Sequence, residues 1–214
     1  RPHFLGEVID GCMAYLENPA ITIDALIEII PGPDFPTGGL ILGRSGLRAA
    51  YHKGRGSIVM RGCVSVETIR KEREALIITQ IPYQVNKATL VERIAELVRE
   101  KKVEGIADVR DESDRQGYRV VVELKRDAVP DVVLNQLYRI TTLQSAFGAN
   151  LVALNGGRPE QMTLKYMIAA FSQFREEVVT RRTKFLLNKA RDRAHILAGL
   201  VIAVANIDEV IKLI

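Results

Sequence analysis

Two short stretches carry the residue types that bind phosphate. Residues 38–45 read GGLILGRS, which differs from the phosphate-binding loop of nucleotide hydrolases by one arginine in place of lysine. Residues 43–56 read GRSGLRAAYHKGRG, where glycines twice flank an arginine. Glycine lets the backbone come close to a phosphate, and arginine supplies a two-pronged hydrogen-bond donor. Both stretches therefore indicate a phosphate-containing ligand.

A nucleotide loop fits GGLILGRS poorly. Such a loop needs a strand before it and a helix after it, but PDFPT precedes this string. Arg44 also lacks the compact ammonium of the usual lysine. We expect Leu40 to Leu42 to anchor the loop in the core and Gly43 to Gly46 to face the phosphates of a nucleic-acid backbone. An autonomous nucleotide-binding enzyme stays as an alternative hypothesis.

Positive charge is concentrated around these stretches. Residues 44–73 contain eight basic and two acidic side chains, a net charge of +6, whereas the whole chain carries +4. Clustered positive charge favours a polyanionic partner, although solvated surfaces would look the same in sequence. The predicted DNA contacts in this segment are Arg44, Arg48, Lys53, Arg55 and Arg61. A second basic cluster, residues 175–193, we assign to solvated and packing faces of a helix.

Other chemistry is not indicated. The three histidines, His3, His52 and His195, form no recognisable triad or metal pattern. Two isolated cysteines are typical of reduced, buried thiols. The acidic string RDESDRQG reads as a solvated hairpin turn. We expect no catalytic residue, metal site or cofactor in this chain.

The elements that must position the basic residues begin with short helices. Apolar spacing predicts a helix over residues 5–18 and a second one after Thr22, which can cap it. The nine residues PGPDFPTGG exclude regular structure. A helical turn is expected at residues 47–51. A longer helix runs from the cap Asn86 to Lys101, and another spans about residues 131–140.

Alternation of apolar and polar residues predicts one half-exposed strand over residues 57–66. It forms an antiparallel hairpin with EALIITQI, and the connecting TIRKER gives this hairpin a basic tip. A second hairpin turns at SDRQG, and ANLVALNG is a last short strand. From Ala75 to Gly156 the order strand, helix, strand, strand, helix, strand is ferredoxin-like, so we expect an α+β fold.

The C-terminal part differs. No glycine or proline occurs between Thr163 and Gly199, and apolar residues recur every seven positions, which predicts a long, projecting coiled-coil helix. The apolar face of NIDEVIKLI lacks a partner, so we expect a piece of a longer protein. Neither a membrane span nor a signal peptide is indicated, and we expect a cytoplasmic location.

Seven segments together resemble one family over essentially the whole chain. They are IPGPDFPTGG, GRSG, AYHKGRG, IPYQVNK, VEGIADVRDESDRQGYRVVVELKRDA, LYRITTLQSAFGANLVALN and EVVTRRTKFLLNKARDRAHILAGL. The family comprises the A subunits of bacterial type IIA DNA topoisomerases, that is, of DNA gyrase and topoisomerase IV. The first and fifth segments look more like gyrase.

The resemblance implies a tower domain followed by the start of the coiled-coil arm. Its expected parts are residues 1–35 as a helical segment of the tower, 36–160 as the sheet domain of the tower, and 161–214 as the arm. Towers of this family hold the outer arms of bent double-stranded DNA by phosphate contacts. Lys87, in YQVNK at a helix N-terminus, becomes a sixth predicted DNA contact.

The family's enzymatic parts are expected elsewhere. Its A subunit forms an A2B2 complex with an ATP-hydrolysing B subunit, so ATP and Mg²⁺ are implied for that partner. The family cuts DNA with a tyrosine in an Arg-Tyr-Thr setting, and none of the six tyrosines here has that setting. We expect a DNA-binding scaffold that is inactive alone. The alternatives are a purely structural module that positions the arm, or the equivalent segment of topoisomerase IV.

Overall fold

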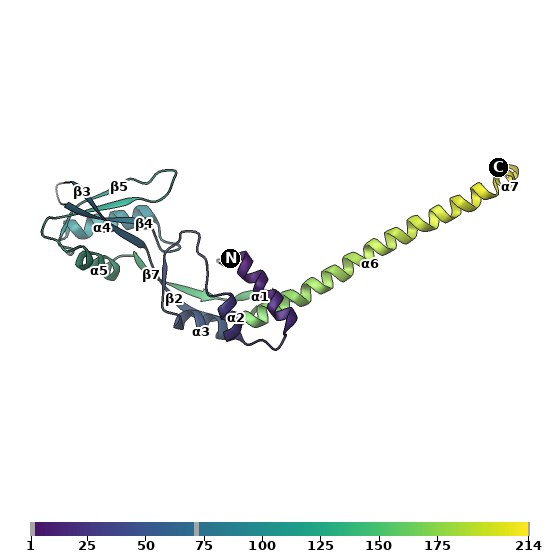
Figure 1. The fold of residues 1–214 in the computed structure, drawn as a ribbon, viewed down its shortest axis with the longest axis horizontal. Helices are drawn as coiled ribbons and strands as arrows, with labels where there is room; N and C mark the ends of the chain where they lie inside the picture. Colours follow the sequence, from purple (N-terminus) through teal and green to yellow (C-terminus); the bar gives the residue numbers. More distant parts are fainter. Residues whose placement is uncertain (1–2, 71–72, 214) are drawn as a thin grey trace. The chain divides into compact units, whose positions relative to one another are not determined.

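The computed structural model describes residues 3–70 and 73–213 (Figure 1). These residues belong to two compact units, Arg1–Met167 and Ile168–Ile214. The fold class is α+β with antiparallel sheets and a long C-terminal helix, as predicted. Within the described ranges, no helix is both long and apolar enough to cross a membrane.

Three short helices come first. They are α1 (Leu5–Glu17), α2 (Ile23–Ile29) and α3 (Ser45–Lys53). Thr22 caps α2 as predicted, because its Oγ1 accepts a hydrogen bond from the Ala25 N–H at 3.2 Å. Helix α3 is longer than the predicted turn. It ends at Gly54, whose φ of 75° is the left-handed conformation that glycine adopts readily.

Sheet A positions most of the predicted DNA contacts. Its strands are β1 (Leu40–Leu42), β2 (Arg55–Arg61) and β7 (Gln144–Asn150), and β2 lies between the other two in antiparallel pairing. Helix α3 packs against β2, where a side chain on Gly46 would overlap the Ser57 carbonyl oxygen. Gly56, in turn, lies against Gly46 and Ala50. Glycines therefore allow the helix to lie directly on the strand.

Sheet B holds the larger hydrophobic core. Its strand order is β3-β4-β6-β5, with bounds β3 (Cys63–Arg70), β4 (Arg73–Gln80), β5 (Ile106–Asp111) and β6 (Val120–Leu124). Helices α4 (Lys87–Arg99) and α5 (Pro130–Ile140) cover one face. Asn86 caps α4 as predicted, since its Oδ1 accepts from the Thr89 N–H at 3.3 Å. The core joins Leu76, Ile78, Val120 and Val122 to Leu90, Ile94, Leu97, Val133 and Leu137.

The predicted single strand over residues 57–66 is wrong. It is divided at Gly62 into β2, in sheet A, and β3, in sheet B. The Gly62 N–H donates to the Leu143 carbonyl at 2.9 Å, and a side chain on Gly62 would crowd Leu143 and the Gln80 carbonyl. Because Gly62 has no side chain, the backbone can pass from sheet A to sheet B between Leu143 and the Gln80 carbonyl. The β3–β4 hairpin is confirmed, but residues 71–72 of its predicted basic tip lie outside the described residues.

The ferredoxin-like order of elements is present from β4 to β7, with one difference in pairing. The last strand, β7, pairs with β2 in sheet A and does not join sheet B. Strand β3 occupies the place beside β4 instead. Element order along the chain is set by local sequence, whereas strand partners depend on side chains far apart in sequence.

The final strand prediction also needs a correction, because it covers two elements. After β7 comes a separate hairpin, β8 (Val152–Asn155) with β9 (Arg158–Gln161). The long helix is confirmed as α6 (Leu164–Ala205), whose 42 residues are followed by α7 (Ile207–Leu213). At 1.5 Å per residue, α6 is about 63 Å long.

Candidate nucleic-acid interface

The string GGLILGRS forms a strand, a turn and the start of a helix. Leu40–Leu42 is β1, Gly43 turns with a φ of 74°, and Arg44 precedes the first residue of α3. The strand lies inside the string and not before it, so this is not the geometry of a nucleotide loop. The backbone of Gly39 binds another part of the chain and not a phosphate, because its N–H donates to Gln80 Oε1 at 2.7 Å.

Two expectations for this string are wrong. Leu40 is 54% exposed and does not anchor the core. Gly46 faces the backbone of β2 at Ser57, where α3 packs on the strand, and is not free to face a phosphate. The reason is tertiary in both cases: β1 is an edge strand of sheet A, and α3 lies flat on the central strand.

Three of the predicted DNA contacts lie on or beside α3: Arg48 and Lys53 belong to the helix, Arg44 precedes it, and all three are exposed. Arg48 is paired, since its Nη2 lies 2.6 Å from Asp24 Oδ1 on α2. His52 Nε2 is 3.1 Å from the same oxygen. Hydrogen bonds from His52 and then from Arg48 lower the pKa of the Asp24 carboxyl. Asp24 thus occupies part of the basic surface of α3.

Strand β2 carries two more predicted contacts, Arg55 and Arg61. Side chains alternate along a strand, so these arginines share one face, while Ile58 and Met60 on the other face are buried. Helix α3 lies on the face of Gly56, Ile58 and Met60. The arginines of β2 and the cations of α3 are therefore on opposite sides of sheet A.

The face that bears Arg55 and Arg61 is lined by small residues. Across from β2, the residues Gly148 and Ala146 of β7 stand opposite Ser57 and Val59. A side chain on Gly148 would meet nothing within 4 Å. At about 3.3 Å per residue, the Cα atoms of the two arginines are about 20 Å apart along this open surface.

Arg61 has neutral partners. Its Nε donates to Gln144 Oε1 at 2.6 Å, and its guanidinium lies 4.6 Å from the centre of the Tyr138 ring. Sequence reasoning missed Gln144 and Tyr138, because they follow Arg61 by more than seventy residues and belong to no recognisable motif. Only the pairing of β2 with β7 brings Gln144 beside Arg61.

Lys87 is the first residue of α4, one of the helices that cover sheet B. Its Nζ is 2.6 Å from Asp111 Oδ2 and 5.6 Å from the centre of the Tyr118 ring. The Lys87 contact, followed by the Ser113 hydroxyl, lowers the pKa of Asp111 from 3.8 to about 2. Lys87 thus holds the β5–β6 connection against the helix.

The six predicted DNA contacts therefore fall into three groups and do not form a single strip. One group is on or beside α3, one is on the open face of sheet A, and Lys87 is at the start of α4. Their roles as DNA contacts stay predictions. Arg44, Lys53, Arg55 and Arg61 form no ion pair with any carboxylate in the part of the chain that the structure describes.

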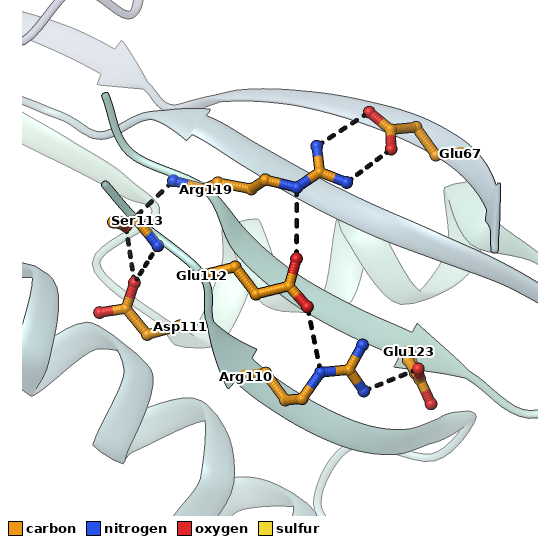
Figure 2. Close-up of polar contacts among 7 residues, drawn as sticks. All are labelled: Glu67, Arg110, Asp111, Glu112, Ser113, Arg119 and Glu123. Carbon is orange, nitrogen blue, oxygen red and sulfur yellow. Dashed lines mark hydrogen bonds and ion pairs between the residues drawn. The ribbon is translucent and has the colours of Figure 1, made fainter. Parts of the chain in front are cut away.

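Two further arginines, Arg110 of β5 and Arg119 just before β6, are joined to carboxylates, as Figure 2 shows. Arg119 Nη2 is 2.8 Å from Glu67 Oε2, and Arg110 Nη1 is 2.7 Å from Glu123 Oε1. Glu112 lies between the two arginines and contacts the Nε of each at 3.3 Å. We call these five residues the charge ladder.

The charge ladder lies on the face of sheet B opposite α4 and α5. Ala75, Ile77 and Val121 share this face by strand alternation and are at most 1% exposed. Long charged side chains can cover apolar neighbours with their aliphatic stems. The acidic string that we predicted to be a solvated turn therefore contributes Glu112 to an ordered surface network.

An open sheet face whose arginines lack carboxylate partners among the described residues suits a protein that contacts a phosphate backbone. Comparison with known families gives the class: the family of DNA gyrase/topoisomerase IV A subunits matches residues 1–214. The chain belongs to this family.

The relatives described next are all DNA gyrase A subunits. Gyrase is also the branch of the family that two of the quoted segments resemble more. The chain is 62% identical over 208 residues to the DNA gyrase A subunit of Granulibacter bethesdensis, covering 97% of this chain and 22% of the relative. It is 60% identical to that of Rickettsia conorii and 57% identical to that of Pseudomonas aeruginosa, with all of this chain and 24% and 23% of the relatives covered. The chain thus spans about a quarter of the length of the curated relatives it matches.

Proposed function

We propose that this chain is a DNA-holding segment of a gyrase-type A subunit. In this role it binds the phosphates of a bent duplex on either side of the point where the parent enzyme cuts. It contributes affinity and position, but no reacting group. The parent protein would work in an A2B2 complex with a B subunit that binds ATP and Mg²⁺, and the DNA-cutting tyrosine would lie outside this chain.

The observation that supports this proposal most directly is that four of the predicted DNA contacts are not neutralised by carboxylates of the described chain. Arg44, Lys53, Arg55 and Arg61 have no carboxylate partner among residues 3–70 and 73–213. Residues 44–61 contain no Asp or Glu at all. Surface cations that are left without counter-charges attract a polyanion and release its condensed counterions on binding.

The test is salt-dependent binding of a fluorescent duplex of about 25 base pairs to the 214-residue chain. Four phosphate contacts predict a slope of about −4 in a plot of log affinity against log salt concentration. Replacing Arg44, Lys53, Arg55 and Arg61 together by alanine should abolish most of this slope. Binding that is indifferent to salt, or unchanged in this variant, would overturn the proposal.

Two pairwise variants then identify the surface that is used. Arg55→Ala with Arg61→Ala removes the charges of sheet A, and Arg44→Ala with Lys53→Ala removes those of α3. Each pair that contacts DNA should lower the slope by about 2 and the affinity at 0.15 M salt about 30-fold. The two pairs are matched controls for each other because each removes two positive charges.

A structural role is the alternative, and one observation favours it. Leu164, the first residue of α6, is only 7% exposed and belongs to the first compact unit, while most of the helix belongs to the second. The first residue of α6 is therefore packed within the first unit, as a structural role requires. If this were the whole function, the fourfold alanine variant would support supercoiling normally when it is placed in the full-length protein with its B subunit.

A further inference from the structure

Arg61 differs from Arg44, Arg48, Lys53 and Arg55 because it is half-buried, whereas those four residues are exposed. It lies on the central strand of sheet A, between the exposed Leu40 of β1 and Gln144 of β7. A charge that is partly removed from water normally requires an opposite charge or several hydrogen bonds. Within the described residues, Arg61 has one side-chain hydrogen bond, to a neutral amide.

That hydrogen bond uses only one of the guanidinium donors. Gln144 Oε1 accepts from Nε, and the four N–H groups of Nη1 and Nη2 have no acceptor in the described part of the chain. These four hydrogens form the end of the guanidinium that can bind two oxygens at once. An oxyanion with two oxygens matches this set of donors.

The Tyr138 ring fixes the plane of the same guanidinium. The ring centre is 4.6 Å from Arg61 Cζ, a distance typical of a cation–π contact. The Tyr138 hydroxyl donates to the Gly62 carbonyl at 3.2 Å, so the ring is tied to the residue next to Arg61. Burial raises the pKa of this hydroxyl, which keeps it protonated as a donor.

We propose that Gln144 and Tyr138 are positioning residues, which hold Arg61 so that its Nη groups bind the two free oxygens of one phosphodiester of duplex DNA. This inference rests on the proposed function and adds a specific geometry to it. A neutral amide and a ring fix the guanidinium without cancelling its charge. A carboxylate in either place would orient it equally well but would neutralise it.

The geometry predicts that replacement by lysine affects duplex affinity differently at Arg61 and at Arg55. Lysine keeps the charge but cannot hydrogen-bond through Nε to Gln144 while it presents two donors to a phosphate. Arg55 has no such partners among the described residues, so only its charge matters. Arg61→Lys keeps the charge but loses the two-pronged contact, so it should lower duplex affinity about three- to fivefold while the salt slope stays unchanged, whereas Arg55→Lys should bind within about twofold of the unaltered chain.

The positioning residues are tested by Gln144→Met, which keeps the size of the side chain and removes the acceptor. Affinity for the duplex should fall about three- to fivefold while the salt slope stays unchanged, because the charge is still present. In the Arg61→Ala background, Gln144→Met should have no further effect. Tyr138→Leu should behave in the same way, and Gln144→Met keeps the test decisive if that variant fails to fold.

The outcomes separate this inference from the proposed function. If the unaltered chain binds DNA with the expected salt slope but Arg61→Lys binds normally, the positioning role is wrong and the DNA-holding role stands. The same holds if Gln144→Met lowers affinity equally with and without Arg61. If the unaltered chain shows no salt-dependent binding, both proposals are overturned.

Discussion

Sheet A and sheet B both present arginines on an exposed face, but the side chains that contact these arginines differ in charge between the two sheets. In sheet B, Arg110 and Arg119 are held by the carboxylates of the charge ladder. In sheet A, Arg61 is held by a glutamine and a tyrosine ring, and Arg55 has no carboxylate partner among the described residues. An arginine that is paired with carboxylates serves the fold, whereas one that is oriented by neutral groups keeps its charge for a ligand. The type of partner, more than the number of arginines, distinguishes the two surfaces.

The largest expected effect tests whether sheet A has one packed and one open face. Gly46→Ala places a methyl group against the Ser57 carbonyl, so it should destabilise the fold by about 3 kcal/mol. Gly148→Ala, on the face of Arg55 and Arg61, is the control. It should change the free energy of unfolding by less than about 1 kcal/mol. Urea denaturation measures both, and equal losses would contradict the assignment of faces.

The next effect separates the arginines of the two sheets. Arg110→Ala with Arg119→Ala breaks the charge ladder, so the melting temperature should fall by about 2–4 °C. Duplex affinity should change less than about twofold, because these charges are already neutralised in the folded chain. Arg55→Ala with Arg61→Ala should show the opposite pattern, with weaker binding and an unchanged melting temperature. If both pairs weakened binding equally, the distinction between the sheets would fail.

A pH effect sharpens the assignment of Lys87 to the fold. The pKa of Asp111 is lowered to about 2 in the folded chain by Lys87 and Ser113. Since this value lies below the ordinary 3.8, the contact stabilises the fold above about pH 4 and is lost as the pH falls toward 2. Melting curves of Asp111→Asn should therefore vary less between pH 5 and pH 2 than those of the unaltered chain. Asp127→Asn is a control, and the expectation is refuted if both variants follow the unaltered chain.

The smallest effect concerns Asp24, the one carboxylate within residues 3–70 and 73–213 that contacts the basic surface of α3. Removing Asp24 would leave Arg48 and His52 free for phosphate, so Asp24→Asn should raise duplex affinity about two- to threefold. Glu28→Gln, one turn further along α2, removes the same charge away from these contacts and should have a smaller effect. A loss of affinity in Asp24→Asn would mean that Asp24 serves to position α3 for binding.

Local sequence was sufficient for most elements. Thr22 and Asn86 predicted the starts of α2 and α4, because a cap acts within three residues of itself. The absence of glycine and proline predicted α6, since helix formation depends on neighbouring residues. Alternation also indicated that Arg61 lies on a half-exposed strand, and the quoted segments indicated the family.

Beyond the two predicted hairpins, only the tertiary structure decided which strands pair and which charges are neutralised. The sequence offered no reason for β7 to join β2, or for Gly62 to divide a continuous alternating pattern between two sheets. Arg119 and Glu67 are separated by 52 residues, and Arg61 and Gln144 by 83. A strand's periodicity determines which side chains share a face, but it does not determine what will lie across from them. For this reason the basic residues could be found from the sequence, whereas the partners that leave Arg61 charged and hold it in place could be found only in the fold.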